Sequence, residues 1–137
     1  MKNKKILILG SSGFLGNHLV KTLYKNNNVI QFDTNPPGQH YKGSTFIKGS
    51  ILDKALVLRA MNDVDIVYHF AAMTDLDIVN NNPAQAIEIN IAGTTNVLDA
   101  CIKKRVKRSQ IKFKKIWSRI YNSRKFKIKE VNRWVHL

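Results

Sequence analysis

The feature that most constrains this chain is the order of elements within residues 4–33. An apolar run from Ile6 to Leu9 ends at a glycine and predicts a strand that is buried on both faces. Apolar residues then recur at helical spacing from Leu15 to Leu23, and a second apolar run, Val29 to Phe32, predicts another strand. The second strand ends in an acid, Asp33. This order of strand, glycine turn, helix, strand and carboxylate is the arrangement that holds a dinucleotide.

Three glycines, Gly10, Gly13 and Gly16, lie in the turn between the first strand and the helix. The first allows a tight turn, the second lets the backbone approach a pyrophosphate, and the third lets the helix pack against the sheet. The helix start offers unpaired N–H groups to the phosphates. Asp33 lies about twenty residues further on, where a carboxylate accepts bonds from ribose hydroxyls and repels a 2′-phosphate. The segment therefore predicts NAD rather than NADP; the alternative is that the glycines serve only turns and packing.

The remaining pattern up to residue 101 alternates strands with helices. Residues 45–49 predict a short third strand, Asp53 predicts the cap of a helix that runs to Met61, and Val64–Phe70 predicts a fourth strand. Pro83 predicts the start of a long helix that ends near Cys101, with an Asn as its cap. Such alternation predicts an α/β fold with an incomplete, Rossmann-like parallel sheet of order 3-2-1-4. The ligand crevice is expected between strands 1 and 4.

Two polar residues lie within these apolar elements. His69 is interpreted as a strand-end residue that bonds to the backbone, in preference to a catalytic role. Asn90 lies one helical turn from Gly93, and the sequence leaves two roles open for it, a satisfied core amide or a cofactor contact.

The charge of the chain is concentrated at one end. Residues 1–101 hold 9 Lys/Arg and 8 Asp/Glu, whereas residues 102–137 hold 14 Lys/Arg and a single acid, Glu130. Such asymmetry marks a tail of different role or origin. The predicted organisation is a nucleotide-binding half-domain, residues 1–108, followed by a basic tail, residues 109–137, that is helical or disordered.

The composition argues against a membrane-spanning, a secreted or a metal-binding protein. No apolar stretch reaches the roughly 20 residues that span a bilayer, and the N-terminal apolar run is too short for a signal peptide. The single cysteine, Cys101, suits a reducing compartment and is expected to be buried, so a cytoplasmic protein is predicted. The four histidines lack the spacing of paired ligands, and no metal site is predicted.

Several motifs taken together resemble the extended short-chain dehydrogenase/reductase family, specifically its NAD-dependent sugar-nucleotide epimerases and dehydratases. The match covers residues 4–108. Its motifs are Gly10-Ser-Ser-Gly13-Phe-Leu-Gly16, Asp33, His69-Phe-Ala-Ala72, and Asn82-Pro83 followed by Asn90-Ile-Ala-Gly93-Thr94-Thr-Asn96-Val-Leu.

The resemblance implies NAD bound across the strand ends and a nucleotide-sugar substrate in the parent family. It implies that Ser50 and Ile51 flank the adenine, where the family often has an Asp in place of the serine. The cofactor residues expected from the motif and the resemblance together are Gly10, Gly13, Phe14, Leu15, Gly16, Asp33, Ser50, Ile51, Phe70, Ala71, Ala72 and Asn90.

The resemblance ends after Arg108, where the family continues with an apolar strand, a Ser/Thr and a Tyr-x-x-x-Lys helix. Tyr121 and Lys125 match that spacing only formally, because basic residues are so common in the tail. Three interpretations of the tail stay open: a truncated or frame-shifted product, a nucleic-acid or anionic-surface binding segment of basic and aromatic residues, and an intact minimal enzyme. The first predicts a chain that is not catalytic alone. An exposed fourth strand is expected to favour a homo-oligomer.

Overall fold

The computed structural model describes residues 1–111 of the chain, and the predictions for the rest of the tail, Tyr121 and Lys125 included, lie outside the described residues. Within them, five parallel strands form one sheet of order β3-β2-β1-β4-β5. The strands are β1 (Lys5–Leu9), β2 (Asn28–Asp33), β3 (Ser44–Lys48), β4 (Ile66–His69) and β5 (Arg108–Ile111). The predicted order 3-2-1-4 is confirmed and is extended by one strand.

The fifth strand corrects two expectations. The expected sheet ends at its fourth strand, yet β5 begins at Arg108 and pairs with β4 from Ile66↔Arg108 to His69↔Ile111. Its sequence, Arg-Ser-Gln-Ile, carries no apolar run. The strand can form without one, because parallel pairing is made by backbone groups and does not need a buried side chain at every residue. Since β5 covers β4, the fourth strand is not exposed, and the reason given for a homo-oligomer is wrong.

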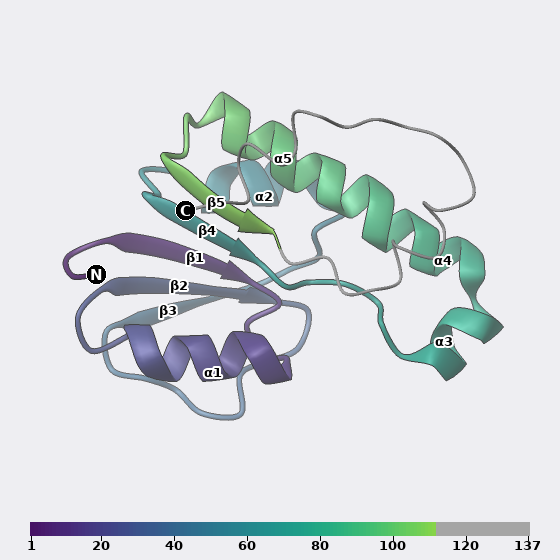
Figure 1. Cartoon of the computed structure of the whole chain (residues 1–137), viewed down its shortest axis with the longest axis horizontal. Coiled ribbons are helices and arrows are strands. Elements are labelled where there is room, and N and C mark those ends of the chain that lie inside the picture. The colour runs from purple at the N-terminus through teal and green to yellow at the C-terminus, as the bar shows by residue number, and fades with distance from the viewer. Residues whose placement is uncertain (112–137) are drawn as a thin grey trace.

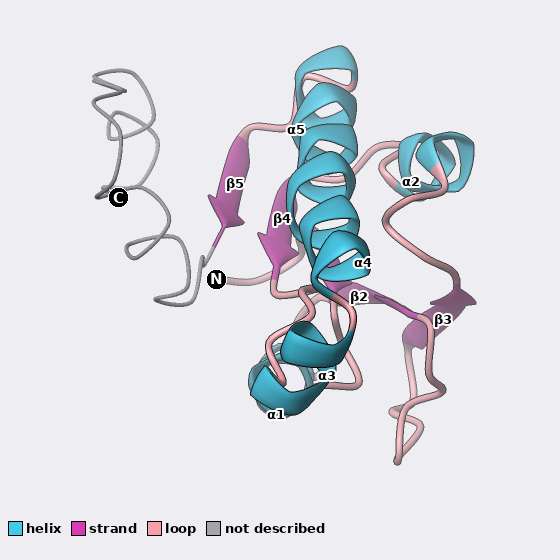
Figure 2. Cartoon of the chain, turned by 90° about the vertical axis from the view of Figure 1, so that its right-hand side faces the viewer, coloured by secondary structure: helices cyan, strands magenta, loops and turns pink. Residues whose placement is uncertain are grey.

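Helices lie on both faces of the sheet (Figures 1 and 2). Helix α1 (Phe14–Leu23) packs on one face, over a cluster of buried side chains from β1, β2 and β4. Helices α2 (Lys54–Ala60) and α5 (Thr94–Lys103) contact each other and cover the opposite face. The core on that face joins Leu7, Phe32, Val57, Val67 and Val97. Each central strand is therefore buried on both sides, as its continuous apolar run predicts.

The helical run after β4 differs from the single helix predicted from Pro83 to Cys101. It consists of α4 (Pro83–Ile87), a π-helical turn η1 (Glu88–Gly93) and α5, preceded by a short helix α3 (Leu76–Asn81) that was not predicted. Pro83 does occupy the first helical position, but Asn82 makes no side-chain capping bond. Helix α3 is capped by Asp75, whose side chain accepts from the N–H groups of Asp77 and Ile78.

Two other local predictions are confirmed. The Asp53 carboxylate accepts from Leu56 N at 2.9 Å and caps α2. Cys101 is buried on α5, and this burial raises the pKa of its thiol to about 11.

Within the described residues, no helix combines the length and apolar character that crossing a membrane requires.

The third motif glycine sets how closely α1 approaches the sheet. A Cβ at Gly16 would collide with the carbonyl oxygen of Gly10 and would come within 2.7 Å of Ser11 Cα. Both are backbone atoms, so no side-chain rotation relieves the contact. The start of α1 is thus held directly on the turn that follows β1.

The Gly16→Ala variant is expected to lower the free energy of unfolding by about 1–3 kcal/mol, because the helix must shift to admit the methyl group. The matched control is Gly38→Ala, since no atom lies within 4 Å of a Cβ at that loop position. This control is expected to change stability by less than about 1 kcal/mol. Urea unfolding followed by circular dichroism measures both values. Equal stabilities of the two variants would contradict the packing role of Gly16.

Candidate functional site

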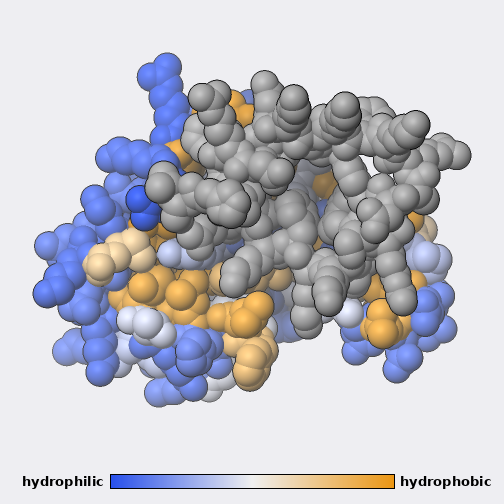
Figure 3. Space-filling model, in the orientation of Figure 1, coloured by the Kyte–Doolittle hydropathy of each residue, from blue (hydrophilic) through white to orange (hydrophobic). Residues whose placement is uncertain are grey.

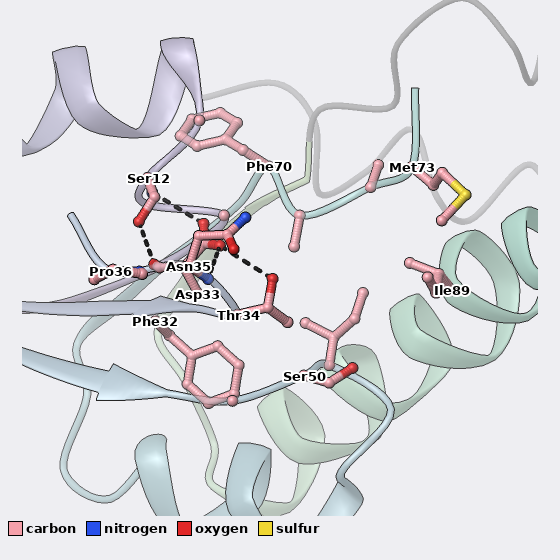
Figure 4. A pocket seen from close by; sticks show the side chains of 16 residues that line it. Ser12, Phe32, Asp33, Thr34, Asn35, Pro36, Ser50, Phe70, Met73 and Ile89 are labelled. Carbon is pink, nitrogen blue, oxygen red and sulfur yellow. Dashed lines mark hydrogen bonds between the residues drawn. The ribbon is translucent and has the colours of Figure 1, made fainter. Parts of the chain in front are cut away.

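A pocket of about 470 Å³ opens at the carboxyl ends of the strands (Figure 4). Its walls come from the segments that follow β1, β2, β3 and β4, together with Ile89 of η1. The predicted crevice at strands 1 and 4 is therefore part of a pocket that also extends over the end of β2. A volume of this size is usual for small-molecule sites.

The structure brings most of the predicted cofactor residues to this pocket. Those that line it are Gly10, Gly13, Asp33, Ser50, Ile51, Phe70, Ala71 and Ala72. The other predicted residues, Phe14, Leu15, Gly16 and Asn90, do not line it. Gly16 instead serves helix packing, as described above.

The glycine turn after β1 is bound to the strands on both sides. Phe32 O accepts from Gly10 N at 2.9 Å, and Leu9 O accepts from Phe70 N at 2.8 Å and from Ala71 N at 3.0 Å. Gly10 has a φ of +81°, and a Cβ there would lie 2.5 Å from Ala71 N. Only glycine therefore allows β1 and the loop after β4 to meet at the floor of the pocket.

The N-terminus of α1 presents unpaired donors near this floor. Gly13, its N-cap residue, provides no side-chain bond, and the first bond of the helix runs from Asn17 N to Gly13 O at 2.9 Å. The N–H groups of the first turn therefore have no partner in the helix. Phe14 is 91% exposed and Leu15 is 49% exposed. Figure 3 shows apolar surface around α1. Only the backbone groups of these two residues, not their side chains, fit the predicted role.

The Asp33 carboxylate is fixed at the end of β2 by backbone donors. One oxygen accepts from Ser12 N at 2.9 Å, and the other accepts from Asn35 N at 3.0 Å. Ser12 Oγ in turn donates to Asn35 O at 2.7 Å, so the loops after β1 and β2 are joined at this point (Figure 4). A carboxylate oxygen accepts more than one hydrogen bond, and so Asp33 can also bind a hydroxyl from a ligand.

Of the two roles left open for Asn90, the geometry shows the satisfied amide. Its Oδ1 accepts from Met73 N at 2.8 Å, and its Nδ2 donates to Met73 O at 2.9 Å. Asn90 lies in the π-helical turn, and this pair of bonds fixes the loop whose residues Phe70–Met73 line the pocket. Gly93 of the same turn packs on the side chain of Ile51, another lining residue.

His69 contacts a side chain on α5, and the prediction that it bonds to the backbone is wrong. Its Nε2 lies 3.1 Å from Thr94 Oγ1, and both residues are buried. Its Nδ1 has no partner, and burial lowers the pKa of His69 from 6.5 to about 4. The imidazole is therefore neutral at pH 7 and links β4 to the first residue of α5.

Several lining residues were not predicted, notably Ser12, Asn35, Met73 and Ile89. Ser12 directly precedes the motif glycine Gly13, and Asn35 lies two residues after the motif acid Asp33, so their proximity to the motif was an available signal. No sequence signal identified Met73 and Ile89, because their positions depend on the loop after β4 and on the π-helical turn.

The described residues hold no other recognisable chemical centre. Among residues 1–111, no group of His, Cys, Asp and Glu could hold a metal ion. None of the tyrosines in that range is followed four residues later by a lysine, and none lines the pocket. Within the described range, the groups that face the pocket can bind and orient a ligand, but they include no tyrosine–lysine pair for proton transfer.

The fold and the glycine turn define the class: an α/β domain of the Rossmann type. Residues 6–115 match the model of the NAD dependent epimerase/dehydratase family. The chain belongs to this family.

Curated relatives in this family match most of the chain but only part of their own length. One is a UDP-N-acetylglucosamine 4,6-dehydratase (inverting) from Campylobacter jejuni, 39% identical over 79% of this chain and 36% of its own. Another, from Bacillus cytotoxicus, is a UDP-N-acetyl-alpha-D-glucosaminuronate decarboxylase, 32% identical over 73% of this chain and 33% of its own. The chain therefore spans about a third of the length of these relatives.

Solved structures agree with this assignment. A UDP-N-acetylglucosamine 4-epimerase from Methanobrevibacter ruminantium has a TM-score of 0.73 and 27% identity over 80% of this chain and 37% of its own. The enzyme WbmH of Bordetella bronchiseptica, in complex with NAD+, has a TM-score of 0.69 and 30% identity over 77% of this chain and 37% of its own.

The buried His69 predicts a loss of stability in mild acid. Between pH 6.5 and about 4 the unfolded chain binds a proton that the folded chain does not, so stability falls as the pH falls through this window. The slope is expected to reach at most about 1.4 kcal/mol per pH unit. Urea unfolding at a series of pH values measures it.

The His69→Gln variant serves as the control, because an amide can bond to Thr94 but does not titrate. It is expected to flatten the curve between pH 6.5 and 4. The loss at lower pH should persist, since the pKa of Asp65 and of Asp99 is lowered from 3.8 by other contacts. An unchanged slope in the variant would exclude His69 as the cause.

Proposed function

We propose that this chain binds NAD in the pocket at the carboxyl ends of the strands. We propose further that it forms the cofactor-binding part of a nucleotide-sugar epimerase or dehydratase. The observation that carries the proposal is the meeting of the glycine turn, the uncapped start of α1 and the Asp33 carboxylate at one pocket. These are the groups that a dinucleotide requires at its pyrophosphate and at its adenosine ribose.

The residues present fit this cofactor. The pyrophosphate would lie over Gly10 and Gly13, where a Cβ at Gly13 would meet nothing closer than Gly10 O at 3.5 Å. The backbone N–H groups of Phe14, Leu15 and Gly16 would face it. Asp33 would accept bonds from the ribose, and Ser50 with Ile51 would border the adenine. Phe70, Ala71 and Ala72 would border the nicotinamide, where the small side chains of the two alanines allow a flat ring to approach.

NAD, when bound, supplies reversible hydride transfer, and the protein positions it. The chain's own contribution in the described residues is to bind and orient this cofactor. The substrate class is a nucleotide sugar, on the strength of what the relatives are named for. We propose that this chain alone does not turn over substrate, because it spans only about a third of the length of the enzymes that it resembles.

The Asp33→Asn variant tests the ribose contact. Loss of the charge is expected to weaken NAD binding about tenfold or more, because a bond to a charged acceptor is replaced by a neutral one. It should also narrow the preference for NAD over NADP, since the repulsion of the 2′-phosphate disappears. Asp77→Asn, on α3 and away from the pocket, makes the same charge change and should leave both affinities unchanged.

Calorimetric titration with each dinucleotide measures these affinities. NAD that binds wild type and Asp33→Asn equally well would show that Asp33 does not hold the ribose. Failure of wild type to bind NAD at all would refute the proposed function.

Turnover is tested by incubating the chain with NAD and a panel of UDP-, GDP- and dTDP-sugars. No epimer or keto-sugar is expected, while the same samples should bind NAD. Product formed at an enzymatic rate would show that the chain holds a complete active site.

A further inference from the structure

The segment that follows β3 forms one wall of the pocket. It would determine which base of a dinucleotide the site accepts, and the class of cofactor alone does not determine this. We infer that Ser50 makes the base end of this site indifferent to the substituent at the purine 6-position. Adenine and hypoxanthine dinucleotides of nicotinamide should then bind alike. This inference rests on the proposed function, with the base bordered by Ser50 and Ile51.

The position of Ser50 is fixed by its neighbours. Gly49 N donates to Asp33 O at 2.9 Å, which ties the segment to the end of β2. On the other side, Ile51 is buried and packs against Gly93 of the π-helical turn. The backbone on both sides of Ser50 is therefore held, and its side chain has little freedom to leave the wall.

The hydroxyl of Ser50 is partly used within the chain. Its oxygen accepts from Leu52 N at 3.2 Å. A hydroxyl has one proton to donate and two lone pairs. Ser50 thus keeps its donor proton and one acceptor position for a ligand, and the O–H rotates to suit either.

The backbone acceptors nearby are already engaged. Ser50 O accepts from Asp53 N at 3.0 Å. The carbonyl oxygens of Ile51 and Leu52 accept from the side-chain amide of Asn96 at 3.1 and 3.3 Å. The hydroxyl is therefore the group of this short segment that can either donate to a ligand or accept from it.

The chemistry of the purine edge then decides the selectivity. Adenine carries a donor amine at position 6 beside an acceptor N1, and hypoxanthine carries an acceptor carbonyl there beside an N1–H donor. A carboxylate that faces position 6 only accepts, so it would bind the amine and repel the carbonyl, whereas a hydroxyl can donate or accept and meets either base at this edge. The carboxylate among the described lining residues is Asp33, which is bound to Ser12 N and Asn35 N at the end of β2.

The experiment compares NAD with nicotinamide hypoxanthine dinucleotide by calorimetric titration. The two ligands share both riboses, the pyrophosphate and the nicotinamide, so their difference reports on the base alone. For the wild-type chain, the two Kd values are expected to agree within about threefold. In the Ser50→Asp variant, NAD is expected to bind at least about tenfold more tightly than the hypoxanthine analogue, because the new carboxylate accepts from the amine and repels the carbonyl.

Asn35→Asp is the matched control. It adds the same charge to another lining residue of the same pocket, at the end of β2. It should change both affinities by the same factor and leave their ratio at the wild-type value.

The outcomes separate the inference from the proposed function. If wild type binds NAD but rejects the hypoxanthine analogue more than tenfold, the inference fails and the proposed function stands. It fails equally if Ser50→Asp leaves the ratio unchanged or abolishes binding of both ligands, or if Asn35→Asp creates the selectivity. If wild type binds neither dinucleotide, the proposed function fails, and the inference fails with it.

Discussion

The backbone contact between the turn after β1 and the loop after β4 is the constraint on which the rest of this structure depends. Gly10 adopts a φ of +81° and brings its α-carbon so close to Ala71 that no side chain fits between them. Leu9 O accepts from both Phe70 N and Ala71 N, and Phe32 O accepts from Gly10 N. The ends of β1, β2 and β4 are thereby joined at one point, and this point is the floor of the pocket.

In a parallel sheet, a pocket of this kind forms where the order of the connections between strands reverses. From β1 the chain proceeds to β2 and β3 on one side and then returns to β4 and β5 on the other. The loops that leave β1 and β4 consequently diverge and leave a crevice between them. Here the crevice is lined by the backbone of the glycine turn, by apolar side chains and by a carboxylate that already accepts from two N–H donors. Such preorganised donors and acceptors need little rearrangement to receive a charged, hydroxyl-rich ligand.

The π-helical turn has a comparable structural role on the opposite wall. It directs Asn90 to both backbone groups of Met73, places Gly93 on Ile51 and leads into Thr94, the partner of His69. A π turn adds one residue to a helical turn and changes which side chains face the sheet. Through these contacts, one turn of helix positions the loop after β4 and the segment after β3, both of which line the pocket.

The sequence by itself determined the strands, the turn and the helix of the glycine motif and the place of its acid. Continuous apolar runs identified β1, β2 and β4, the glycine spacing identified the turn, and Asp33 and Asp53 were placed correctly. It did not reveal β5, because a strand at the sheet edge is stabilised by backbone pairing that leaves no apolar pattern in Arg108–Ile111. Nor did it reveal the π turn or the partners of Asn90 and His69. Those depend on side chains meeting residues 17 and 25 positions away, and only the packed sheet and helices bring such distant groups within bonding distance.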